Sequence, residues 1–291
     1  MIRLYDHSLE QYSTGMRTSP AIRRALASLA LATGVTGWSQ TPTAAPKTFQ
    51  SEGVTINPGS TAGNYTYLSN GTLTLTHDIQ SQATSAFLNS TLKITEFTAS
   101  FTYLATTAQN YFADGATFVI QNSPQQTAAL GSAGYGLGYV GITNSVAVAF
   151  NVFNAYGVGI KVAENGYFNG PYLNTSPVFL DAQRPIRVQI TYSGGVLSTN
   201  LMDLSNQDTF STSQAINIPA IVGSEFAYVG FTGGTGAGVS LQQISDFSFT
   251  TSVPEPSVTI LLVSGAAGIA WVSRRKRRSI QPEVASTSAR T

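Results

Sequence analysis

The 291-residue chain contains no cysteine and few charged residues. The lack of cysteine excludes disulfide bonds, thiolate nucleophiles and thiolate metal ligands. Charged residues make up 10% of the chain, against about 25% in a typical soluble domain. Long Glu/Lys-rich amphipathic stretches, from which helix bundles are built, are also missing, so the composition argues against an all-helical fold.

Basic residues are scarce in the middle of the chain. Residues 39–252 contain five basic and ten acidic residues, a formal charge of −5. With no basic stripe to neutralise phosphates, we expect no nucleic-acid partner. The same region has one histidine, His77, and isolated carboxylates, so it lacks the paired acids of a glycosidase. We therefore predict no catalytic residues and no cofactor, with a glycoside hydrolase as a minor alternative.

The start of the chain has the pattern of a secretory signal peptide. Arg17, Arg23 and Arg24 precede an apolar run from Ala25 to Val35, followed by small and polar residues. The run is too short to span a bilayer stably. We predict a signal peptide and leader over residues 1–44, and an amphipathic surface helix is the alternative.

The other end carries three elements in a fixed order. Val253-Pro254-Glu255-Pro256 precedes an apolar segment, Val258–Val272, and the basic cluster Arg274–Arg278 follows. The segment is short for a membrane span, and the cluster favours a cytoplasmic end. This order resembles the PEP-CTERM sorting signal of Gram-negative bacteria. The resemblance implies a short hydrophobic helix within residues 253–278, a transient inner-membrane anchor and cleavage by a membrane sorting enzyme. Residues 279–291 form a polar tail, and a plain single-pass anchor remains the alternative.

Short strand-like segments separated by turn signals fill the region between these ends. Several alternate apolar with polar residues, as in Thr72–Thr76, the period of a half-buried strand. Glycine-rich turn segments, such as Gly131–Gly138 and Gly233–Gly238, separate them. We predict one all-β domain over residues 45–252, an antiparallel jelly-roll β-sandwich with almost no helix. The expected strands are Thr72–Thr76, Phe97–Tyr103, Ala116–Ile120, Ser145–Phe153, Ile186–Tyr192, Phe226–Phe231 and Ile244–Thr250.

Several sequence blocks, in order, resemble the legume (L-type) lectin domain, which has the concanavalin-like sandwich fold. The blocks are Leu68–Thr76, Ala113–Ile120, Gly134–Tyr139, Ser145–Phe153 and Val229–Gly236. With the further blocks Ala83–Phe87, Phe97–Phe101 and Ile244–Phe249, they are distributed over nearly all of residues 45–252. The resemblance implies a non-catalytic carbohydrate-binding protein.

The resemblance also implies a sugar site. Asp114 occupies the position of the family's sugar-binding aspartate, and Gly134 and Gly136 occupy the glycine turn facing it. Phe153 is the expected apolar platform for a sugar ring, with Asn154 and Gly234 at the rim. Each assignment has a purely structural alternative. Asp114 would be a turn aspartate bonded to its own backbone, Gly134 and Gly136 part of a glycine-rich hairpin, and Phe153 a buried core residue.

The family's calcium and manganese ligands are replaced in this chain. The positions of its first two acidic ligands hold Ala149 and Asn151, and Ala155 stands at the asparagine position. Hard divalent cations need several carboxylate oxygens, so we predict no metal site. In the family the metal supports a cis peptide before the aspartate. Without metal we expect the Ala113–Asp114 peptide to be trans or held by other contacts.

Two function hypotheses remain open besides the hydrolase. The first is a carbohydrate-binding protein, exported to the cell envelope, the outer surface or the extracellular matrix, whose partners are a glycan and the sorting enzyme. The second is a structural or adhesive envelope protein that uses the lectin fold without binding sugar. A second copy of the chain, pairing through a flat sheet, is a further candidate partner.

Overall fold

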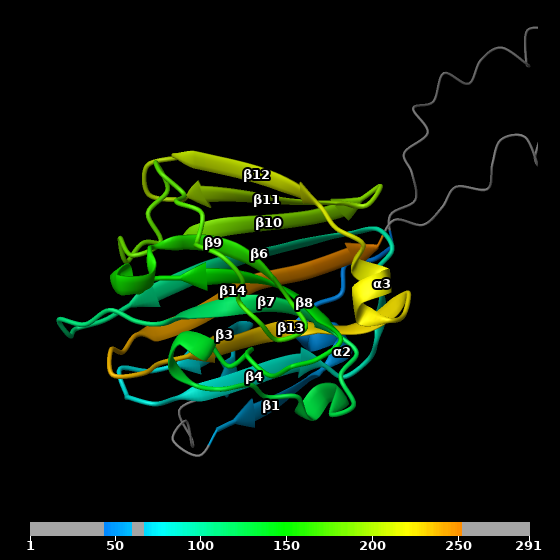
Figure 1. The fold of residues 1–291 in the computed structure, drawn as a ribbon, viewed down its shortest axis with the longest axis horizontal. Helices are drawn as coiled ribbons and strands as arrows, with labels where there is room; N and C mark the ends of the chain where they lie inside the picture. Colours follow the sequence, from blue (N-terminus) through cyan, green and yellow to red (C-terminus); the bar gives the residue numbers. More distant parts are fainter. Residues whose placement is uncertain (1–43, 60–66, 252–291) are drawn as a thin grey trace, which may run out of the picture. The chain divides into compact units, whose positions relative to one another are not determined.

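The computed structural model describes residues 44–59 and 67–251, in which two antiparallel sheets pack against each other (Figure 1). One sheet, which we call the front sheet, has the strand order β1-β4-β13-β7-β8-β9, and the short β5 also pairs with β13. The other, the back sheet, has the order β12-β11-β10-β6-β14-β3-β2. The predicted all-β antiparallel sandwich is therefore confirmed at the level of its two sheets.

The front sheet consists of β1 (Val54–Pro58), β4 (Ala83–Leu88), β5 (Leu92–Lys93), β7 (Gly115–Gln121), β8 (Ser145–Asn151), β9 (Gly159–Glu164) and β13 (Phe226–Gly234). The back sheet consists of β2 (Tyr67–Ser69), β3 (Thr72–Thr76), β6 (Phe97–Thr106), β10 (Ile186–Ser193), β11 (Val196–Asp203), β12 (Thr209–Ala215) and β14 (Leu241–Thr251). Helix in the described residues is limited to single turns, which are α2 (Phe49–Glu52), α3 (Ile218–Val222), η2 (Gln126–Ala128), η3 (Gly134–Gly136) and η4 (Asn154–Tyr156).

The two sheets enclose an aromatic core because their inward-facing positions alternate with outward ones. In β10, Val188 and Ile190 are buried, whereas Arg187 and Gln189 between them are exposed. Phe231 of β13 lies at the centre of this core. Its ring centroid is 4.9 Å from that of Phe101 on the back sheet, and it also contacts other buried or partly buried rings. These edge-to-face contacts connect the two sheets.

β7 and β8 are buried on both faces. The outward face of the front sheet is covered by the chain segment 122–144, which contributes Tyr139 and Ile142 to a second apolar cluster with Val119 and Ala147. The Tyr139 hydroxyl is hydrogen-bonded to Ser145 at 2.9 Å. The glycine-rich residues 131–138 of this segment are thereby held directly against the front sheet.

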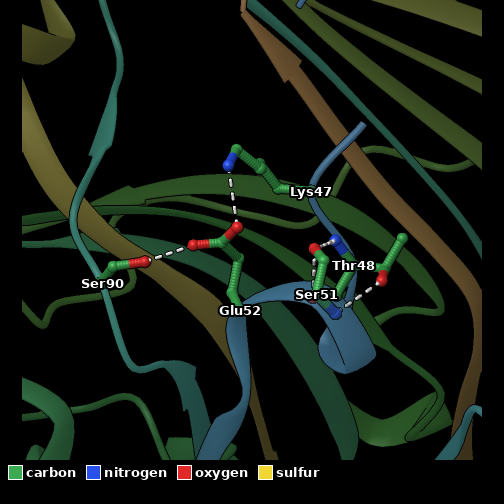
Figure 2. A network of polar contacts seen from close by, with 5 residues as sticks. All are labelled: Lys47, Thr48, Ser51, Glu52 and Ser90. Carbon is green, nitrogen blue, oxygen red and sulfur yellow. Dashed lines mark hydrogen bonds and ion pairs between the residues drawn. The ribbon is translucent and has the colours of Figure 1, made fainter. Parts of the chain in front are cut away.

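A polar network fixes the point at which the chain enters the sandwich (Figure 2). Thr48 and Ser51 form a capping box at the start of α2, with bonds of 2.9 and 3.1 Å between side chain and backbone. Glu52 accepts hydrogen bonds from Lys47, at 2.8 Å, and from Ser90. These two bonds lower the pKa of Glu52, and the bond from Lys47 has the larger effect.

The predicted signal peptide and sorting segment fall almost entirely within residues 1–43 and 252–291, which lie outside the described residues. None of the helices in the described part of the chain is long and apolar enough to cross a membrane.

Truncation of Phe231 tests the central position of this ring. We expect Phe231→Ala to lower the free energy of unfolding by about 3–5 kcal/mol, because the ring is fully buried and a cavity remains. Phe226→Ala on the same strand is the control, since Phe226 is 51% exposed, and it should cost less than about 1 kcal/mol. Urea unfolding monitored by circular dichroism provides both values. Equal losses in the two variants would contradict the assignment.

Candidate functional site

Asp114 is held between two strands of the front sheet. Its N–H donates to the carbonyl of Gly234 at 3.2 Å, and its carbonyl accepts from the N–H of Val152 at 3.0 Å. The next residue, Gly115, starts β7 and pairs with Gly234 on one side and Asn151 on the other. Gly115 has φ +149°, and a Cβ there would lie 2.2 Å from a β8 carbonyl, so this close strand contact requires glycine.

The Ala113–Asp114 peptide bond is cis. Of the two alternatives that we expected in the absence of metal ligands, the trans bond is wrong, and a bond held by other contacts remains. Neighbouring contacts include a hydrogen bond of 2.7 Å from the Ser240 hydroxyl to the carbonyl of Ala113.

The carboxyl group of Asp114 is almost fully enclosed. The residue is 4% exposed, and among the described residues its buried Oδ2 atom has no hydrogen-bond partner. Burial raises the pKa of Asp114 to about 6, and the N–H of Gly236 opposes this rise. A Cβ on Gly236 would lie 3.1 Å from Oδ2 and 3.3 Å from the Cα of Gly134, so backbone alone covers the carboxylate at this point.

The glycine turn lies beside Asp114 as predicted, but its N–H groups are not free. The N–H of Gly134 donates to the carbonyl of Thr235 at 3.0 Å, and that of Gly136 to the carbonyl of Ala133 at 3.2 Å. Gly136 is also buried. In this structure the two N–H groups are therefore engaged within the turn and with the residue that follows β13, and their role as donors to a sugar stays a prediction.

The other three predicted site residues are only partly brought together. Gly234 is buried, and its carbonyl accepts from Asp114, so it lies beneath the site and not at a rim. The residue that faces the carboxylate from this segment is Gly236, which we had not predicted. Phe153 is half-buried, with its ring centroid 5.4 Å from that of Tyr156, and the exposed Asn154 begins η4 beside it.

The residues at the family's metal positions do not fit a divalent cation. Ala149 has no donor atom, and the side-chain N–H groups of Asn151 donate to the carbonyls of Phe153 at 2.9 Å and Gly157 at 2.8 Å. Lys161 of β9 pairs in register with Ala149, so a cationic side chain lies where carboxylates would be needed. Among the described residues, no three acidic or histidine side chains gather in a group that could hold a metal ion.

A cavity of about 420 Å³, which we call the aromatic pocket, adjoins this region. Its main lining side chains are Tyr135, Tyr156, Lys161, Tyr167, Phe168 and Tyr172. Sequence reasoning missed it, although Tyr167-Phe168 and Tyr172 stand in a loop rich in Gly, Asn and Pro, away from any alternating strand pattern. Aromatic residues in such a segment were the available signal.

Comparison with known proteins identifies the family. The legume lectin domain model matches residues 48–262. The chain belongs to this family. Its members are non-catalytic carbohydrate-binding proteins, so the prediction that the chain is not an enzyme is confirmed and the hydrolase alternative is wrong. Among curated proteins, no sequence matches the chain.

Solved legume lectins share the fold at low sequence identity. Lectin II from Ulex europaeus is 18% identical with a TM-score of 0.58, and arcelin-5, a lectin-like defence protein from Phaseolus vulgaris, is 21% identical with a TM-score of 0.54. The Bauhinia forficata lectin, solved in complex with GalNAc, is 21% identical with a TM-score of 0.57. Each match covers 69% of this chain and 93% of the other chain.

The raised pKa of Asp114 predicts a pH-dependent effect on stability. Burial destabilises the charged form, so the carboxylate costs stability above about pH 6 and nothing below about pH 4, where both folded and unfolded forms are protonated. We expect Asp114→Asn to raise the free energy of unfolding at pH 8, by at most about 3 kcal/mol. This gain should shrink as the pH falls from 6 to 4. Urea unfolding at pH 4, 6 and 8 measures it.

Asp181→Asn provides the matched control, because Asp181 is an exposed aspartate of the same domain. It should change stability little at any of the three pH values. A gain in Asp114→Asn that is the same at pH 4 and pH 8 would show that charge burial is not its cause.

Proposed function

We propose that the chain is a non-catalytic carbohydrate-binding protein that uses the carboxylate of Asp114 as the acceptor for sugar hydroxyl groups and needs no metal ion. The observation that carries this proposal is the buried Oδ2 atom of Asp114, which has no hydrogen-bond partner in the described part of the chain. A buried carboxylate oxygen without a hydrogen bond is costly and uncommon. A sugar hydroxyl is a ligand group that supplies the missing hydrogen bond.

The surroundings of Asp114 support access by a ligand. Gly236 approaches the carboxylate with backbone atoms only, and Gly134 lies directly beside Gly236. Among the relatives of similar fold, the Bauhinia forficata lectin was solved with GalNAc and lectin UEA-II with galactose, which favours a sugar as the ligand class here.

A second candidate function is a structural or adhesive protein that keeps the lectin fold without binding sugar. The observation that favours it is the 4% exposure of Asp114, together with the engaged N–H groups of Gly134 and Gly136. In this case the carboxylate remains covered, and the loops around it serve only to pack the front sheet.

For the two ends of the chain we propose export and sorting. The basic and apolar start of the chain and the order Pro254-Glu255-Pro256, apolar segment, basic cluster support an exported protein of the envelope, outer surface or matrix. Cleavage near Pro256 by a membrane sorting enzyme would then release the lectin domain from a transient inner-membrane anchor.

Binding to a glycan array, followed by ligand-observed NMR, tests the proposed sugar site. For a monosaccharide on a shallow site we expect a Kd of about 0.1–1 mM, unchanged by EDTA. Asp114→Asn removes the charged acceptor and should weaken binding about 30-fold, from a loss of about 2 kcal/mol. Asp181→Asn should bind like the wild type. Equal binding by folded Asp114→Asn would refute the site, and a wild type that binds no glycan would leave the structural function.

The intact mass of the native, cell-derived protein tests the sorting proposal. We expect the mature chain to end near Pro256, because the Pro-Glu-Pro element precedes the apolar segment that would be removed. A mature chain that retains Arg274–Arg278 would show that the segment is a plain anchor.

A further inference from the structure

The aromatic pocket has the features of a second carbohydrate subsite. Three of its tyrosines are largely exposed: Tyr135 by 61%, Tyr156 by 55% and Tyr167 by 65%. The ring centroids of Tyr135 and Tyr156 are 6.3 Å apart, and those of Phe168 and Tyr172 are 6.2 Å apart. Exposed aromatic rings that gather around one hollow are typical of binding surfaces. Their faces suit the C–H face of a pyranose, and the tyrosine hydroxyls can bond its polar groups.

The pocket lies next to Asp114. Asn151, at one end of its lining, pairs across the sheet with Gly115, the residue that follows Asp114. Tyr172 is also close enough to feel the charge of that carboxylate, which adds to burial in raising the pKa of Tyr172. The aromatic pocket and Asp114 are therefore neighbours, as binding of one glycan chain to both requires.

The pocket contains a cation without a counter-ion. The Lys161 ammonium group lies 4.2 Å from the centroid of the Tyr172 ring and donates to the carbonyl of Gly170. No aspartate or glutamate is among the lining residues, and in the described part of the chain no carboxylate forms a salt bridge with Lys161. Burial lowers the pKa of Lys161, so its charge is only partly compensated by the ring and the carbonyl.

We propose that the aromatic pocket binds an acidic sugar, a uronate residue of a glycan chain, with its carboxylate on Lys161 and its ring among Tyr135, Tyr156 and Tyr167. The inference rests on the proposed function, since the neighbouring neutral residue is the one that contacts Asp114. A volume of about 420 Å³ is within the range of small-ligand sites. Charge complementarity favours an acidic over a neutral sugar residue, because the carboxylate of the sugar replaces water at the partly buried ammonium group of Lys161.

Matched disaccharides test this proposal on the full chain. The probes are glucuronic acid linked to glucose, galactose or mannose, each paired with the neutral disaccharide made by reducing the carboxyl group. For at least one pair, titration calorimetry should show the acidic member binding about tenfold tighter or more. This preference should fall to about one in Lys161→Gln. Lys93→Gln is the control for net charge, because Lys93 lies on β5 outside the pocket.

A second variant keeps the test independent of Lys161. Tyr167→Ala removes an exposed ring and should weaken the acidic and the neutral member of a pair by a similar factor. Equal affinity within every pair, a preference that survives in Lys161→Gln, or no binding of any acidic disaccharide up to about 10 mM would overturn the proposal. Neutral binding that depends on Asp114 alone would leave the proposed function intact and refute only the acidic subsite. Binding of an acidic disaccharide that depends on Lys161 but not on Asp114 would support the acidic subsite and refute the proposed role of Asp114.

Discussion

The position of the candidate site depends on the register of three central strands. Three residues stand side by side in this register: Gly234 of β13, Gly115 of β7 and Asn151 of β8. Because Gly115 has no Cβ, β8 can lie close to it; a Cβ at this position would be only 2.2 Å from the carbonyl oxygen of Phe150. This register puts Asp114 next to the end of β13 and the start of the loop after β8. A shift of one of these strands by one residue would turn its side chains to the opposite face, so the core and the site are fixed by the same pairing.

Asn151 shows how the loop after β8 is held without the family's metal ions. Its side chain donates two hydrogen bonds, to the carbonyls of Phe153 and Gly157, and thereby joins both ends of the turn η4. Lys161, in register with Ala149, brings a positive charge to the same face of the sheet. The loop is thus fixed by the hydrogen bonds of the Asn151 amide. The positive charge on this face of the sheet is that of Lys161, whose side chain lines the aromatic pocket.

The fold was more predictable from the sequence than the site. The alternating segment Ile186–Tyr192 is a strand whose apolar face meets the core and whose polar face is largely exposed. The alternating segment Thr72–Thr76 is also a strand, but Thr74 and Thr76 are buried as well, so the predicted half-burial is wrong there. β7 and β8 show no such alternation, since segment 122–144 covers their second face, and they were predicted as short apolar runs between turn signals, which the lectin blocks supported. Asp114 was found through its Ala-Asp-Gly block. The contact between Gly236 and Gly134, and the bonds that occupy the glycine-turn N–H groups, arise from loops distant in sequence and left no local pattern.

The bridge between the two ends of the described domain has a mechanical consequence. Lys47 and Phe249 exchange two backbone hydrogen bonds of 2.8 Å in antiparallel geometry. The incoming and outgoing chain therefore leave this bridge on the same side. A force that pulls the two ends apart loads such bonds one after another, as in opening a zipper, and not all at once. The bridge itself therefore opens under little tension between the two ends, and the load then passes to the longer pairings of β1 with β4 and of β14 with β6.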